Sequence, residues 1–114
     1  MPKFIGRFYF KLTTNGNLLG EWSNSHSSCI RCATEAANRA GEAEEPNDRS
    51  VSRFVGDYTS VWCEAPNTCT YSNLVIRPKR GCNGIFTVEW TGPAKFIGEA
   101  MLCDDILVGD YRSN

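Results

Sequence analysis

The sequence predicts a mainly β protein that folds as a small antiparallel up-and-down β-barrel of about seven strands with one helix. Three observations favour this fold class: a recurring five-residue unit, glycines on the apolar face of the strands, and short turn signals between strands. A β-sandwich of two sheets is the alternative. With 114 residues, the chain is expected to form a single domain, residues 1–114, because most domains span roughly 100 to 150 residues.

The recurring unit consists of an apolar residue, any residue, a glycine, any residue and usually an aromatic residue. Its copies are Phe4–Phe8, Leu18–Trp22, Phe54–Tyr58 and Leu107–Tyr111, and Phe96–Ala100 lacks the final aromatic. The first, third and fifth positions lie on one face of a strand, because side chains alternate between its two faces. The unit therefore predicts strands with one aromatic face and one charged face.

The same alternation places every aromatic residue except Tyr9 and Tyr71 on the face that carries the glycines. Glycine on a buried face loses packing and costs backbone entropy. Its repeated use predicts strongly curved strands and space for the rings of neighbouring strands, which favours a barrel over a sandwich. The charged residues expected on the solvated face are Arg7, Lys11, Glu21, Asp57, Glu89, Glu99 and Asp110.

Turn signals separate the predicted strands at short intervals. Thr13–Gly16 contains the Asn-Gly pair of tight hairpins, and Ala65–Thr68, Gly92–Pro93 and Asp104–Asp105 contain other turn residues. Pro78–Gly81 begins a basic loop. These short connections predict an up-and-down meander. The strands are expected near residues 3–12, 17–23, 53–64, 70–78, 84–91, 95–103 and 106–112.

One longer connection, at about 24–52, is interpreted as an insertion that holds a helix and an acidic loop. Ser27 or Ser28 is suited to cap a helix that runs to about Ala40. Residues 42–48 then form an exposed acidic loop. The expected apolar stripe of the helix is Ile30, Ala33, Ala36, Ala37 and Ala40.

Charge and hydropathy exclude several classes of partner. A net charge of −1 argues against nucleic acid or an anionic membrane, because phosphate binding needs a surplus of basic residues. No apolar run approaches the ~20 residues that a membrane-spanning helix needs. The start of the chain, Met1–Phe8, lacks the pattern of a secretory signal, so we expect a cytoplasmic protein.

Cys29 and Cys32 form a Cys-x-x-Cys motif at the start of the predicted helix, where the helix dipole and Arg31 would lower a thiol pKa. A thiol-redox protein that uses these two residues is therefore one alternative function. Zinc needs four ligands, and no second pair has this short spacing. We predict no metal and no other cofactor.

The remaining cysteines are expected to be thiols or to form a local disulfide. Cys63 and Cys69 flank a predicted hairpin turn, which would bring them close together. The strand alternation puts Cys63 and Cys103 on the outer face, whereas free thiols usually lie buried. We therefore expect the helix or a second subunit to cover that part of the barrel wall.

Ser60 and Glu64 share the aromatic face of their strand. Glu64 lies at the strand end, where it is expected either at the rim of a barrel mouth or in a solvated turn. No second inward carboxylate is identified, so the sequence supports no acid–base pair. No catalytic residue is predicted, and the leading interpretation is a non-catalytic function.

The leading prediction for function is binding of a small apolar or aromatic molecule at the barrel mouth, where aromatic walls and a few polar groups suit such a ligand. Plain packing of a filled core is the competing interpretation of the same side chains. A structural or partner-binding homo-oligomer is a further alternative. The residues predicted to line the ligand site are Trp22, Tyr58, Trp62, Trp90 and Tyr111.

Four segments, Gly6–Leu12, Asn15–Glu21, Phe54–Trp62 and Gly98–Tyr111, resemble small proteins encoded by bacterial integron gene cassettes. This resemblance implies a cytosolic protein, often a small oligomer, and it identifies no catalytic residues. The Gly-x-aromatic strands are also similar to those of lipocalin-like and avidin-like barrels, which bind small ligands inside. The chain differs from those secreted families in its missing signal sequence and its long connection after the second strand.

Overall fold

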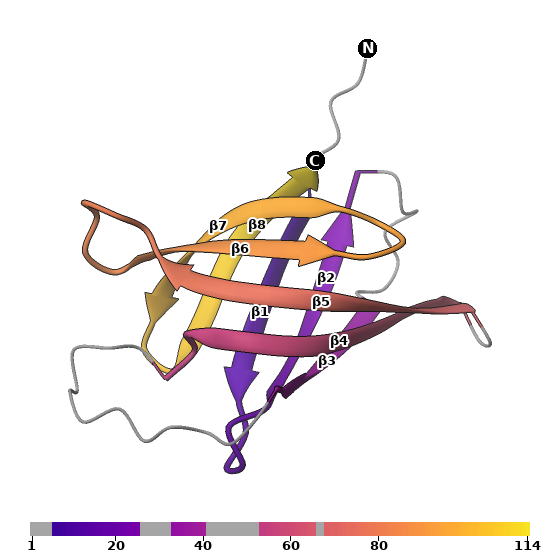
Figure 1. The fold of residues 1–114 in the computed structure, drawn as a ribbon, viewed down its shortest axis with the longest axis horizontal. Coiled ribbons are helices and arrows are strands. Elements are labelled where there is room, and N and C mark those ends of the chain that lie inside the picture. The colour runs from indigo at the N-terminus through magenta and orange to yellow at the C-terminus, as the bar shows by residue number, and fades with distance from the viewer. Residues whose placement is uncertain (1–5, 26–32, 41–52, 66–67) are drawn as a thin grey trace.

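The computed structural model describes residues 6–25, 33–40, 53–65 and 68–114. The strands are β1 (Gly6–Leu12), β2 (Leu18–Asn24), β3 (Ala33–Arg39), β4 (Gly56–Ala65), β5 (Thr68–Pro78), β6 (Ile85–Thr91), β7 (Phe96–Cys103) and β8 (Ile106–Ser113). Each strand pairs antiparallel with the next, and β8 pairs with β1 to close a barrel (Figure 1). The mainly β, up-and-down barrel is thus confirmed, and the sandwich alternative is wrong.

The strand β3 occupies part of the chain that the sequence interpretation assigned to a helix. Its backbone pairs with β2 on one side and with β4 on the other. Its side chains alternate, with Glu35 and Ala37 buried and Thr34 and Asn38 exposed. The helix prediction is therefore wrong over residues 33–40.

The physical reason for this error is that tertiary pairing overrides local propensity. Alanine is the strongest helix former in isolation. In the barrel, however, β2 and β4 would each present an unpaired edge without a strand between them. None of the described residues is helical, and none forms a helix able to cross a membrane. Ser27, Ser28 and the predicted acidic loop at 42–48 lie outside the described residues.

The other predicted strands are confirmed, with ends that shift by a few residues. The Asn-Gly turn is also confirmed: the Gly16 N–H donates to the Thr13 carbonyl at 3.0 Å. Gly16 has a φ of 81°, a left-handed conformation that glycine adopts without steric cost. At the β7–β8 turn, Asp104 adopts the same left-handed backbone conformation, with a φ of 52°. Residues with short polar side chains tolerate this conformation.

The barrel interior consists of the predicted aromatic face. The described aromatic residues of this face are buried, except Trp22 and Phe96, which are half-buried, and Tyr71 lies outside with 67% exposure. Gly6 shows why a glycine stands on this face. A Cβ atom there would lie 2.4 Å from the ring of Tyr111, so the missing side chain makes room for that ring. Phe4 lies outside the described residues.

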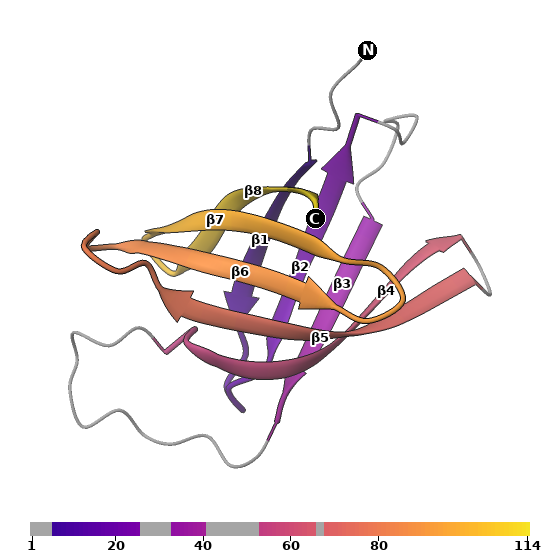
Figure 2. The same ribbon diagram turned by 45° about the horizontal axis from the view of Figure 1, so that its top comes forward.

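The strands form two sets that lie on opposite sides of the core and run at an angle to each other. Figure 2 shows β1, β2 and β3 on one side, running across β5, β6 and β7 on the other, while the β4–β5 hairpin extends past the barrel. Cross-strand ion pairs lie on the outer surface, as the charge alternation predicts: Arg77 contacts Asp57 at 2.8 Å and Lys79 contacts Glu99 at 2.7 Å. The described apolar side chains with no exposed surface are Phe10, Leu74, Ile76, Val88 and Leu107.

Candidate functional site

One end of the barrel is closed by Arg39, the last residue of β3. Its guanidinium donates hydrogen bonds to the carbonyls of Gly16 (3.1 Å), Val55 (2.8 Å) and Arg53 (2.6 Å). It also donates to the hydroxyl of Tyr58 at 2.6 Å and lies over that ring, 4.7 Å from its centroid. This cation holds together the turn after β1, the start of β4 and a core aromatic.

Tyr58 completes this closed end. Its hydroxyl donates to the Phe54 carbonyl at 2.6 Å. Burial raises the pKa of Tyr58 to about 12, although the charge of Arg39 acts in the opposite direction. The phenol therefore stays protonated throughout the physiological range, and its hydroxyl serves as a structural hydrogen-bonding group.

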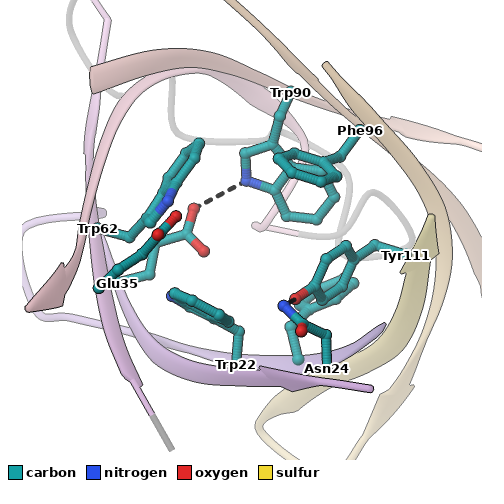
Figure 3. A pocket seen from close by; sticks show the side chains of 9 residues that line it. Trp22, Asn24, Glu35, Trp62, Trp90, Phe96 and Tyr111 are labelled. Carbon is teal, nitrogen blue, oxygen red and sulfur yellow. Dashed lines mark hydrogen bonds between the residues drawn. The ribbon is translucent and has the colours of Figure 1, made fainter. Parts of the chain in front are cut away.

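The opposite end of the barrel contains an open hollow (Figure 3). It measures about 380 Å³ including its mouth, and the centre of a water molecule can range over about 50 Å³ of it. One buried water needs roughly 10–15 Å³ measured in this way, so the enclosed part of the hollow holds a few waters or one small group that enters through the open mouth. Its lining residues are Phe8, Trp22, Asn24, Glu35, Trp62, Glu64, Trp90, Phe96 and Tyr111.

The acidic group inside the hollow is Glu35 of β3, which is only 4% exposed. Its Oε2 atom accepts a hydrogen bond from Trp90 Nε1 at 2.8 Å and another from Ser60 Oγ. Burial raises the pKa of the Glu35 carboxyl, while these two hydrogen bonds act in the opposite direction. No hydrogen bond to the second oxygen, Oε1, is formed by the described residues.

Trp22 of β2 contributes a second polar group that is not satisfied within the barrel. Its indole Nε1 is buried and has no hydrogen-bond partner among the described residues. An unpaired buried donor costs about 1–3 kcal/mol, so such groups are few in native structures. Figure 3 shows the Trp22 indole on the same side of the hollow as the Glu35 carboxylate.

Tyr111 of β8 is held at the mouth by residues from β2. Its hydroxyl accepts a hydrogen bond from Asn24 Nδ2 at 3.0 Å and donates to the Ser23 carbonyl at 3.3 Å. Its pKa is raised by burial first, and the negative charges of Glu35 and Glu64 add to this, whereas the Asn24 hydrogen bond lowers it. These bonds fix the ring that forms one wall of the hollow.

The aromatic rings of the hollow contact one another in tilted and edge-to-face pairs. Ring centroids are 5.2 Å apart for Phe8 and Trp90, 5.8 Å for Trp90 and Tyr111, and 6.2 Å for Trp62 and Phe96. Such geometries are favourable beyond the area they bury. The rings on this wall therefore pack against one another without a ligand.

Four of the five residues predicted to line a site, Trp22, Trp62, Trp90 and Tyr111, lie together around this hollow. The fifth, Tyr58, lies at the closed end instead. It shares a strand face with Trp62, but four residues along a strand correspond to roughly 13 Å. Alternation predicts which face a side chain occupies and leaves open which end of the barrel it reaches.

The sequence interpretation found Glu64 and missed Glu35. Glu64 is exposed and lines the hollow near its mouth, in agreement with the predicted rim position. The prediction that no second inward carboxylate exists is wrong, because Glu35 lies deeper in the same hollow. The available signal was the two-residue alternation of Ala33, Glu35 and Ala37, which the helix interpretation obscured.

Cys63 and Cys69 lie directly opposite each other on β4 and β5 and form a disulfide. The prediction that they are close is confirmed. Cys82 and Cys103 are exposed free thiols, so the expected covering of Cys103 by a helix is wrong. Cys29 and Cys32 lie outside the described residues. Within the described part of the chain, no group of three or more His, Cys, Asp or Glu side chains is placed to hold a metal.

Comparisons with protein families, with functionally characterised proteins and with solved structures found no match for this chain. The resemblance to integron cassette proteins and to lipocalin-like barrels therefore stays a prediction. The fold and the hollow define the chain as a small closed antiparallel barrel with a one-ended interior pocket.

Proposed function

We propose that the open end of the barrel binds a small organic molecule with an apolar or aromatic body and at least one polar atom. The observation that carries this proposal is the buried indole N–H of Trp22, which lacks a partner in an otherwise ordered aromatic pocket. An acceptor atom on a ligand would satisfy this donor. Aromatic and apolar walls with a few convergent polar groups are typical of small-molecule sites.

The experiment uses the tryptophans as reporters, since all three tryptophans of the chain line the hollow. A library of single-ring compounds that includes neutral, cationic and anionic members is titrated against the protein. Indole fluorescence and the indole N–H signals in NMR are followed. Ligands are expected to shift the signals of Trp22 and Trp62 together, because the two side chains line the same pocket.

A matched pair of variants gives the control. Trp62→Phe removes part of the pocket wall and should weaken binding by about three- to tenfold, the size of one aromatic contact. Tyr71→Phe alters an aromatic that is 67% exposed on the outer surface, and it should leave affinity unchanged. The proposal is wrong if no compound of any charge class shifts the indole signals, or if both variants weaken binding equally.

The homo-oligomer alternative stays a prediction. Met101 and Val108 face each other on the outer surfaces of β7 and β8, with exposures of 49% and 37%. Leu102, next to Met101, is 42% exposed as well. The thiol-redox alternative rests on Cys29 and Cys32, which lie outside the described residues, and it also stays a prediction.

A further inference from the structure

We propose that the ligand of this pocket is an organic cation: a molecule with a primary ammonium group bound by Glu35 and, elsewhere on its aromatic or apolar body, an acceptor atom for the Trp22 N–H. This inference rests on the proposed function and specifies the chemical class of the ligand. Four features support it: the sign of the charged groups in the hollow, the hydrogen-bonding capacity of Glu35, the aromatic walls, and the arrangement at the opposite end of the barrel.

The charged groups of the hollow are all acidic. Glu35 and Glu64 line it, and no Lys, Arg or His side chain of the described residues does so. An anionic ligand would bring a further negative charge against two carboxyl groups without a counter-charge. An ammonium group instead supplies the opposite charge that a buried carboxylate needs.

The hydrogen-bonding capacity of Glu35 matches an ammonium donor. Trp90 and Ser60 both donate to Oε2, and no described residue donates to Oε1. An ammonium carries three N–H donors and no acceptor. A charge-assisted N–H···O bond to Oε1 would therefore complete the coordination of the carboxylate and would stabilise its ionised form.

The aromatic walls suit a cation as well as an apolar body. Trp22, Trp62, Trp90 and Tyr111 surround the carboxyl group in Figure 3. Cations are attracted to the faces of such rings, most strongly to tryptophan. Walls of this kind stabilise the ammonium while they contact the rest of the ligand.

The closed end of the same barrel shows how an aromatic side chain and a cation are combined in this fold. There the guanidinium of Arg39 lies over the ring of Tyr58 and satisfies the surrounding acceptors. The open end has more aromatic rings and a carboxyl group, yet the described residues place no cation among them. A ligand ammonium would take the position that Arg39 holds at the other end.

The test compares three probes of similar shape, benzylamine, benzyl alcohol and benzoate. None of them carries a further acceptor on its ring, so they differ only in the group presented to Glu35. Benzylamine is expected to bind about tenfold or more tightly than benzyl alcohol, the usual size of a hydrogen bond to a charged group. Benzoate is expected to bind weakest. Glu35→Gln keeps the shape of the side chain and an acceptor for Trp90, so it should lower benzylamine affinity much more than benzyl alcohol affinity and abolish the preference for benzylamine.

Glu64→Gln is the matched control, because it removes the same charge from an exposed position at the mouth. It should reduce the preference for benzylamine by less than Glu35→Gln does, since solvent screens exposed charges. Equal loss of the preference in both variants would overturn the assignment of the ammonium to Glu35.

A pH series on the unaltered protein tests the same point without a substitution. Burial raises the pKa of Glu35 in the free protein, and a bound ammonium favours the ionised carboxylate. Benzylamine affinity should therefore rise as the pH increases through the raised pKa, with release of a proton to the buffer. The other titratable groups that line the hollow are Glu64 of β4 and Tyr111 of β8, and the Glu64→Gln variant separates the contribution of Glu64.

The outcomes separate this inference from the proposed function. If benzyl alcohol binds as tightly as benzylamine, or if the preference survives in Glu35→Gln, the ammonium assignment is wrong while the pocket still binds ligands. If none of the three probes binds but other library members do, the ammonium assignment is again wrong. If no compound of any class binds, both proposals are wrong.

Discussion

The two ends of the barrel are built from similar aromatic side chains and differ in how their polar groups are satisfied. At the closed end, the guanidinium of Arg39 donates hydrogen bonds to the Tyr58 hydroxyl and to three backbone carbonyls. At the open end, Trp22 has a buried donor without a partner among the described residues, and Glu35 lies under an open hollow. The comparison assigns a structural role to the closed end, and it leaves the open end as the place of the ligand site that we propose.

The largest effect should follow from Arg39→Ala at the closed end. The substitution removes a charged donor to several carbonyls and to the Tyr58 hydroxyl, so we expect a loss of about 3 kcal/mol in the free energy of unfolding. Urea denaturation measures it, with Arg39→Lys as a control that keeps the charge but loses the planar fork of donors. Ligand affinity at the open end should be unchanged in protein that remains folded, and a parallel loss of affinity would contradict the separation of the two ends.

A smaller effect is expected from Gly6→Ala, which acts at the open end. The new Cβ atom would lie 2.4 Å from the Tyr111 ring, so the ring must move. Overpacking of this kind costs about 1–3 kcal/mol, and the displaced ring changes the wall of the hollow. Both the free energy of unfolding and the ligand affinity should therefore fall, whereas Arg39→Ala should lower only the free energy of unfolding. Unchanged affinity would show that Tyr111 is dispensable for binding.

The smallest effect is expected from a matched pair of hydroxyl deletions, one at each end. Tyr58→Phe removes the hydrogen bonds with Arg39 and Phe54 and should cost about 1 kcal/mol of stability without changing affinity. Tyr111→Phe removes the bonds with Asn24 and Ser23 and should weaken ligand binding as well. Equal behaviour of the two variants in the ligand titration would remove the distinction between the ends.

The sequence predicted the fold class well because the main signal is local. Alternation alone determines whether a residue lies on the inner or the outer face of a strand. The apolar-x-Gly-x-aromatic unit shows this alternation in several strands. The same reasoning failed for β3, whose alanines favour a helix locally and whose strand conformation depends on pairing with β2 and β4. Such pairing is a property of the whole barrel.

The candidate site was predicted less completely for related reasons. Trp22, Trp62, Trp90 and Tyr111 were found because they belong to the aromatic face. Tyr58 was misplaced, because alternation does not tell at which end of the barrel a side chain lies. Glu35 was missed because carboxylates are rarely buried, and its position becomes clear once β3 is known to be a strand.

The pairing of β1 with β8 has a consequence for how the pocket comes into existence. The hollow is lined by Phe8 from β1 and by Tyr111 from β8, so its wall forms when the first and last strands meet. Contacts between such distant parts of a chain are entropically costly and tend to form late in folding. During synthesis and refolding, the proposed ligand site should therefore be complete only after β1 has paired with β8.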